Sequence, residues 1–73
     1  MSLRIDFGRA VKSIRREKGF SQEELAERAG LHRTYIGMIE RGEKNLTLEN
    51  IGKIAKSLNI SIVELFIQIE NES

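Results

Sequence analysis

The 73-residue sequence has no cysteine, no proline, few aromatic residues and almost no net charge. The absence of cysteine excludes disulfides, thiolate metal sites and a cysteine nucleophile, and it fits a reducing compartment. No apolar run approaches the ~20 residues that span a bilayer, and the first residues lack the apolar stretch of a signal sequence. With no proline and only Phe7, Phe20, Tyr35 and Phe66 as aromatics, a strand-rich sandwich or barrel is not expected. We therefore expect a soluble, cytoplasmic, all-α protein.

The length of the chain leaves room for one domain over residues 1–73. Its composition, 40% apolar and 32% charged, is that of a globular chain. A domain of this size buries only roughly 60% of its unfolded surface, so a partner subunit is the remaining source of support. A catalytic pocket would need a larger interior, and no nucleophile–base pair, metal cluster or phosphate-cradling loop is visible. We expect no enzyme activity, no cofactor and no metal site.

Three glycines divide the first part of the chain into helices. Gly19, Gly30 and Gly42 each follow a helical apolar pattern, and glycine closes a helix in the left-handed conformation without a steric penalty. We predict a helix over about residues 6–18, a second that begins at a Ser21–Glu24 capping box, and a short third that ends before Gly42. Their inner faces are expected to be Phe7, Ala10, Val11, Ile14, then Leu25, Ala26, Ala29, then Leu31, Ile36 and Ile39.

Two further helices are predicted after a polar loop over residues 43–46. Thr47 caps the fourth, Asn59 follows it, and a second capping box, Ser61 with Glu64, begins the fifth, which runs to about residue 70. We expect the fourth to bury Leu48, Ile51, Ile54, Ala55 and Leu58. Apolar residues surround the fifth, so its own chain cannot cover them all. We predict a homodimer in which the helix over residues 61–70 is the dimerisation element, with Val63, Phe66, Ile67 and Ile69 at the interface.

The two helices between Ser21 and Gly42 are the part of the chain expected to carry function. Their apolar positions allow the first to brace the second at a steep angle, so that the start of the second projects and can enter the DNA major groove. Arg33 can hold guanine O6 and N7 with two donors, and Thr34 can contact a base edge or a thymine methyl group. Gly37 would allow close approach of the outer face. The expected base-reading residues are Arg33, Thr34, Tyr35 and Met38.

These segments resemble a known family. Ser21-Gln-Glu-Glu-Leu-Ala-Glu-Arg-Ala-Gly30 and Tyr35-Ile-Gly-Met-Ile-Glu-Arg-Gly42 are similar to the Cro/Xre (phage-repressor-type) helix-turn-helix family, and the similarity covers nearly the whole chain. Within that family, Arg33-Thr34-Tyr35-Ile36 and Lys44-Asn45-Leu46-Thr47 most resemble the controller proteins of restriction–modification systems. The resemblance implies a five-helix, lambda-repressor-like DNA-binding domain. It also implies a dimeric transcriptional regulator that activates at low occupancy and represses at high occupancy.

The resemblance also assigns roles to polar residues. It implies that Arg15 and Glu40 form a structural ion pair, and that Gln22 and the loop after the third helix hold the DNA backbone. An activator needs a surface for RNA polymerase, which Glu23, Glu24 or Glu27 could provide. His32, the only histidine, has no companion for a metal site, so a helix-start or backbone role is expected. The expected backbone contacts are Gln22, His32, Arg41, Lys44 and Asn45.

Other functions remain open at this point. A phage-type repressor or an antitoxin-like autoregulator would keep the DNA binding, with the fifth helix meeting a different protein. An antitoxin usually needs an additional toxin-binding segment, and only residues 71–73 are left for one. A helical protein-interaction module without DNA binding is the third alternative. For the leading hypothesis, a palindromic operator with half-sites about 34 Å apart would fit a two-fold dimer. Residues 1–45 carry 10 basic and 7 acidic side chains, whereas residues 46–73 carry 2 and 4, so the positive charge lies in the predicted reading half.

Overall fold

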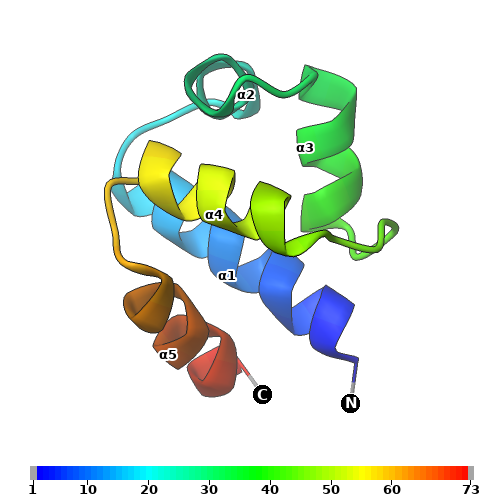
Figure 1. Ribbon diagram of the computed structural model, residues 1–73, viewed down its shortest axis with the longest axis vertical. Coiled ribbons are helices and arrows are strands. Elements are labelled where there is room, and N and C mark those ends of the chain that lie inside the picture. The colour runs from blue at the N-terminus through cyan, green and yellow to red at the C-terminus, as the bar shows by residue number, and fades with distance from the viewer. Residues whose placement is uncertain (1, 73) are drawn as a thin grey trace.

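The computed structural model describes residues 2–72, which form five α-helices and no strand. The helices are α1 (Leu3–Glu17), α2 (Gln22–Ala29), α3 (Arg33–Glu40), α4 (Leu48–Ser57) and α5 (Ile62–Glu72). In Figure 1, α2 is seen end-on and α3 stands upright beside it, so these two helices are steeply inclined to each other; α4 lies in front of α1 and α5 lies below. The predicted all-α fold of five helices is confirmed.

Side-chain caps fix where the helices begin. Ser2 caps α1, which therefore starts at Leu3, three residues before the predicted start. The apolar residues of this first turn, Leu3 and Ile5, are exposed and do not belong to the inner face from which the start was predicted. The Ser21 hydroxyl accepts the Glu24 N–H at 3.0 Å as predicted, but the Glu24 carboxylate accepts from Arg28 instead of returning to Ser21. At α5 the capping box is complete: Ser61 and Glu64 each accept the other's backbone N–H, at 3.0 and 2.8 Å.

All five helices contribute to one hydrophobic core. The predicted inner faces of α1 and α2 are buried, as are Ile36 and Ile39 of α3, whereas Leu31 is half-buried. The prediction for Leu48 was wrong, since its side chain is 84% exposed. Leu48 is the first residue of α4 and lies beyond the end of the core, which that helix meets through Ile54, Ala55 and Leu58.

Glycine permits both the turns and one close approach between helices. Gly19, Gly30 and Gly42 have positive φ, and Asn59 has φ 59°, as expected for residues that close helices. Gly8, to which the sequence assigned no role, lies where α1 crosses the end of α3. A Cβ there would meet the carbonyl oxygens of Ile39 and Glu40, which are backbone atoms that cannot rotate away.

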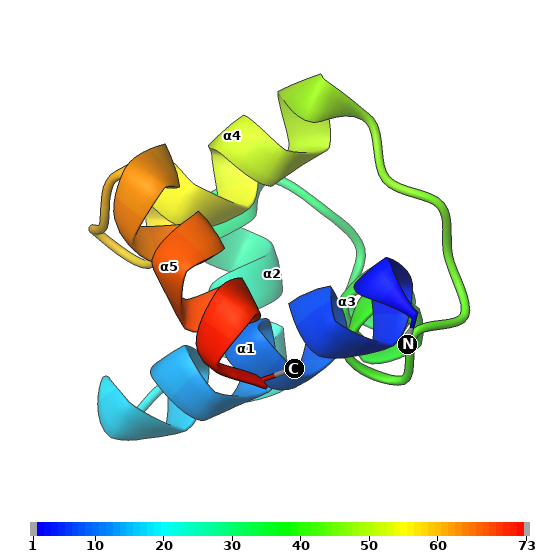
Figure 2. The ribbon, with the colours of Figure 1, turned by 90° about the horizontal axis from the view of Figure 1, so that it is seen from below.

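Helix α5 packs on α1 and α4 through only part of its surface (Figure 2). Leu65 and Ile69 are buried in the core, at 0% and 2% exposure. The assignment of Ile69 to a dimer interface was therefore wrong: it belongs to the face of α5 that covers its own chain. Helix α5 ends at Glu72, slightly beyond the predicted end. Among residues 2–72, no helix is both long enough and apolar enough to cross a membrane.

Candidate nucleic-acid interface

The α2–α3 pair holds the start of α3 at an outer corner of the molecule (Figure 1). Gly30 adopts the left-handed conformation, and the Leu31 N–H donates to the Ala26 carbonyl at 2.9 Å, which closes α2 and redirects the chain. His32 caps α3, because its Nδ1 accepts the Thr34 N–H at 3.1 Å. The predicted helix-start role of His32 is confirmed. Arg33 and Thr34 follow it and are both exposed.

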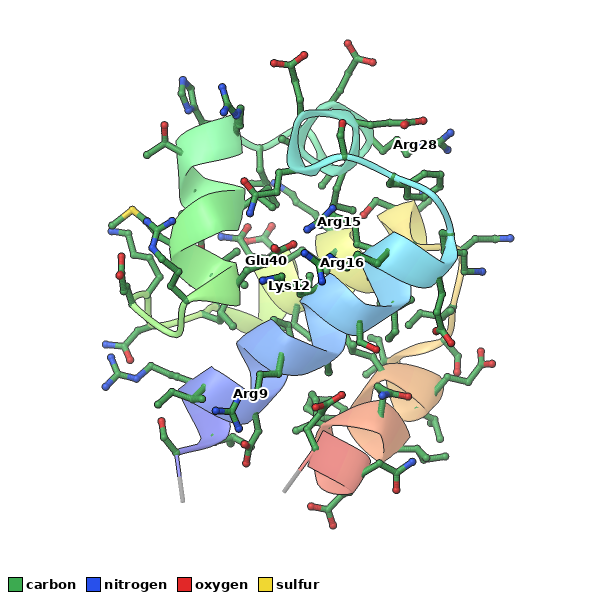
Figure 3. The ribbon with its side chains drawn as sticks, turned by 180° about the vertical axis from the view of Figure 1, so that it is seen from behind. Arg9, Lys12, Arg15, Arg16, Arg28 and Glu40 are labelled. Carbon is green, nitrogen blue, oxygen red and sulfur yellow. The ribbon has the colours of Figure 1, made fainter. Side chains whose placement is uncertain are left out.

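A buried ion pair joins α1 to α3. Arg15 Nε donates to Glu40 Oε2 at 2.7 Å and Arg15 Nη2 to Oε1 at 3.1 Å, a two-point contact that confirms the predicted pair (Figure 3). Arg15 Nη1 also donates to the Phe20 carbonyl at 2.7 Å, just before α2. Gln22, which was predicted to contact a DNA phosphate, is half-buried, and its Nε2 donates to Glu40 Oε1 at 3.0 Å. The pair thereby fixes the start of α2 relative to α3.

The middle of α3 is less exposed than expected. Tyr35 is half-buried, and its hydroxyl accepts from Asn50 Nδ2 of α4 at 2.9 Å. Met38 is half-buried as well. The prediction that Gly37 lies on the outer face was wrong, because Gly37 is buried, and a Cβ added there would approach the guanidinium of Arg41 to 3.2 Å. The accessible reading surface is thus concentrated at Arg33 and Thr34.

The loop between α3 and α4 carries the remaining predicted backbone contacts. Lys44 and Asn45 are both exposed there. Arg41 is also exposed, but its Nε donates to Glu43 Oε2 at 3.0 Å, and this hydrogen bond and charge raise the pKa of Arg41. A phosphate would therefore have to share Arg41 with Glu43, whereas Lys44 has no ion-pair partner in the described chain.

Three of the four predicted interface residues are exposed apolar side chains of α5. Val63 is 67% exposed, Ile67 55% and Phe66 39%. Phe66 lines a groove with Leu46 and Ile51, while Ile67 lies on the other flank of the helix, beside Ile14 and Ile60. Sequence reasoning missed exposed Leu3 and Leu48, of which Leu3 lines the Phe66 groove.

The described residues show no group of side chains arranged as a metal site and no buried polar side chain without a partner. Within residues 2–72, no group of three or more His, Cys, Asp or Glu side chains is placed to hold a metal ion. Among the same residues, every buried side-chain nitrogen and oxygen has a hydrogen-bond partner. Accessible polar side chains lie on every helix, and those predicted to contact DNA lie at the start of α3 and in the loop that follows it.

The steep α2–α3 pair with an exposed α3 start defines a helix-turn-helix protein. A helix-turn-helix family model (HTH_3) matches residues 11–65, which is most of the chain. The chain belongs to the Cro/Xre-type helix-turn-helix family.

Similar proteins within this family include control proteins and, among solved structures, a restriction–modification controller protein. The chain is 44% identical over 71 residues to the control protein C.MunI of a Mycoplasma species, covering 96% of both. It is 53% identical over 55 residues to C.SmaI of Serratia marcescens, covering 75% of this chain and 66% of that protein. Among solved structures, it is similar to the restriction–modification controller protein C.Esp1396I, a tetramer in complex with its natural 35-base-pair operator. That match has a TM-score of 0.92 and 40% identity, and it covers 99% of this chain and 95% of the other.

Proposed function

We propose that this protein is a sequence-specific DNA-binding transcriptional regulator that controls restriction–modification genes and binds a palindromic operator as a homodimer. The observation that carries the proposal is the exposed, braced start of α3, where the side chains of Arg33 and Thr34 form no ion pair or hydrogen bond within the described chain. The similarity to control proteins, one of them solved on its operator, supports the same function. Those relatives are regulators, so we propose no catalytic activity and no cofactor, and a cytoplasmic location.

The proposed reading mechanism assigns bases to α3. The start of α3 enters the major groove, where the Arg33 guanidinium donates to guanine O6 and N7, and Thr34 contacts the neighbouring base. Tyr35 presents the exposed part of its ring, because its hydroxyl is bonded to Asn50. Met38 supplies an apolar surface for a thymine methyl group. These contacts determine which sequence is bound.

Contacts to the DNA backbone position the reading helix. Lys44 and Asn45 lie on the exposed loop after α3 and neutralise or bond phosphates on one side of the groove. Gln22 approaches phosphate on the other side at the start of α2, oriented by its hydrogen bond to Glu40. His32 and Arg41 are supplementary contacts. None of these residues selects a base, so they contribute affinity to all sequences.

The proposed dimer buries the exposed face of α5. Val63, Phe66 and Ile67 of one protomer meet the same face of its partner, and Leu3, which lines the groove with Phe66, extends this apolar surface. A two-fold arrangement would place the two α3 helices about 34 Å apart, one turn of DNA. For activation we propose that Glu23 and Glu27, exposed on α2, face RNA polymerase. Glu24 is the weaker candidate, since it is paired with Arg28.

Selection from a library of random double-stranded DNA tests the proposed function. The full chain is incubated with the library at moderate salt, and bound duplexes are amplified and sequenced. We expect one two-fold symmetric site with half-sites 10–10.5 base pairs apart, centre to centre. Absence of any enriched sequence, together with absence of salt-sensitive binding to DNA, would favour the protein-interaction module instead.

A further inference from the structure

A row of basic side chains runs along the outer face of α1. Arg9, Lys12 and Arg16 are spaced three and four residues apart, which places them on one face of a helix. We call these three residues the α1 basic stripe. All three are exposed, and they point away from the buried face of α1, toward the viewer in Figure 3.

The α1 basic stripe differs from Arg28 and Arg41, which are exposed as well, because no carboxylate forms an ion pair with it. Arg28 is paired with Glu24 at 3.2 Å and Arg41 with Glu43 at 3.0 Å. By contrast, no carboxylate of residues 2–72 lies within 4.0 Å of a stripe nitrogen. Lys12 and Arg16 are four residues apart, a spacing at which like charges destabilise a helix. An anionic ligand would relieve this repulsion.

The α1 basic stripe lines a shallow groove between α1 and the end of α5. The groove is lined by the three stripe residues together with Ser13, Glu17 and Glu72. Glu72 belongs to α5, and Glu17 also lines a groove with Ile67 and Gln68 of α5, so both carboxylates lie on the α5 side of the stripe. A ligand is therefore expected to approach from the α2 and α3 side.

The stripe begins beside the ion pair that joins α1 to the end of α3. Arg16 follows Arg15, which is bonded to Glu40 at the end of α3, and Glu40 in turn holds Gln22 at the start of α2. Figure 3 shows Arg9, Lys12 and Arg16 on the same side of the molecule as the Arg15–Glu40 pair. From Arg16 the stripe extends back along α1 to Arg9, about 10.5 Å at 1.5 Å per residue.

We infer that the α1 basic stripe binds the phosphates of DNA that flanks the half-site read by α3. This inference rests on the proposed function. One DNA strand presents a charge every 3.4 Å or so along the duplex axis, so the length of the stripe matches about three phosphates. The two arginines can each hold a phosphate with paired donors, and Lys12 acts as a point charge. The stripe lengthens the site on DNA without reading its sequence.

The inference is tested with two duplexes that share one operator. The shorter ends at the outer edges of the two half-sites, and the longer adds ten base pairs of arbitrary sequence at each end. The stripe variant is Arg9→Gln/Lys12→Gln/Arg16→Gln. The matched control is Lys18→Gln/Lys53→Gln/Lys56→Gln, which removes the same charge from a groove lined by the end of α1, α2 and α4. Circular dichroism establishes that both variants are folded.

Affinity is measured by fluorescence anisotropy at several salt concentrations. We expect the wild type and the control variant to bind the longer duplex at least tenfold more tightly than the shorter one. The stripe variant should lose this gain, and its salt slope on the longer duplex should fall by about 3 per protomer, at about 0.9 per phosphate.

Three results would overturn the inference. They are an equal affinity of the wild type for both duplexes, an unchanged length effect in the stripe variant, and the same loss of length effect in the control variant. An unchanged length effect would make an acidic protein surface the better match for the stripe. Failure of the wild type to bind either duplex would instead overturn the proposed function, and this inference with it.

Discussion

At the scale of single residues, the Arg15–Glu40 pair determines how the reading helix is held. The two side chains are 10% and 3% exposed, and both oxygens of Glu40 are bonded, one of them also to Gln22. The pair links three helices at one point, so it is a structural element of the proposed interface as much as of the core.

Removal of one partner of this pair should be more destabilising than removal of both. We expect Arg15→Met to lower the free energy of unfolding by on the order of 3–5 kcal/mol, because it leaves the Glu40 carboxylate buried without its cation. Arg15→Met/Glu40→Leu should restore part of that loss. Urea denaturation of both variants and of the wild type measures the difference. A double variant less stable than the single variant would contradict the expectation.

Substitution of two glycines inside helices should change the stability of the fold in opposite directions. Gly8→Ala should destabilise the fold severely, since the added Cβ meets the carbonyl oxygens of Ile39 and Glu40 and forces α1 away from α3. Gly52→Ala meets no atom within 4 Å and should stabilise α4 by about 0.5–1 kcal/mol. Thermal unfolding monitored by circular dichroism distinguishes them. Equal melting temperatures for the two variants would show that the α1–α3 approach tolerates a side chain.

At the scale of helices, the two faces of α5 have different roles. Leu65 and Ile69 cover the core, and Val63, Phe66 and Ile67 remain exposed. An exposed apolar face of this kind on a small domain is typical of a subunit interface.

Substitutions on the two faces of α5 should therefore differ. Phe66→Glu places a charge in the proposed interface and should yield a folded monomer at micromolar concentration. Ile69→Ala removes core volume and should lower stability by about 2–5 kcal/mol without abolishing association of the folded fraction. Sedimentation equilibrium, paired with urea denaturation, separates the effects. A wild type that is monomeric at micromolar concentration would contradict the dimer.

The capping box of α5 predicts a dependence of stability on pH. The hydrogen bond from the Ser61 N–H, supported by the Ser61 side chain and Lys18, lowers the pKa of Glu64 from its ordinary 4.5. A lowered folded pKa means that the charged carboxylate stabilises the fold above about pH 4.5, and that this contribution is lost as pH falls through the folded value. Glu64→Gln should then be less stable than the wild type at neutral pH, with the difference disappearing in acid. Denaturation at pH 3 and pH 7 measures it, and a difference that grows in acid would contradict the assignment.

The local rules of helix capping and termination made most of the elements predictable. Serine, threonine and glycine determine helix ends through nearby atoms, so Ser21, Thr47 and Gly30 could be placed from the sequence. The burial of Ile69 and the exposure of Leu48 could not be predicted from the sequence, because they depend on how α4 and α5 pack on α1. Gly8 was missed for the same reason, since its importance comes from α3, more than 30 residues away. In the site, the exposure of Arg33 and the Arg15–Glu40 pair were predictable, whereas the engagement of Tyr35 by Asn50 was not.

At the scale of the whole molecule, the charge divides along the chain. Residues 1–45 carry a balance of +3 and residues 46–73 a balance of −2, from 10 basic and 7 acidic side chains in the first part and 2 and 4 in the second. The basic part contains the reading helix and the α1 basic stripe, while the acidic part contains the apolar face of α5. This asymmetry favours DNA on one side of the protomer and a partner subunit on the other.

The measurement that tests the central claim most directly compares Arg33→Ala and Lys44→Ala on the selected site and on a scrambled duplex, over a series of salt concentrations. We predict that Arg33→Ala weakens binding to the selected site by about 1–3 kcal/mol and leaves the scrambled duplex nearly unaffected. Lys44→Ala should weaken binding to both duplexes alike and reduce the salt slope by about 1 per protomer. An equal loss on both duplexes for Arg33→Ala would show that the start of α3 does not read bases.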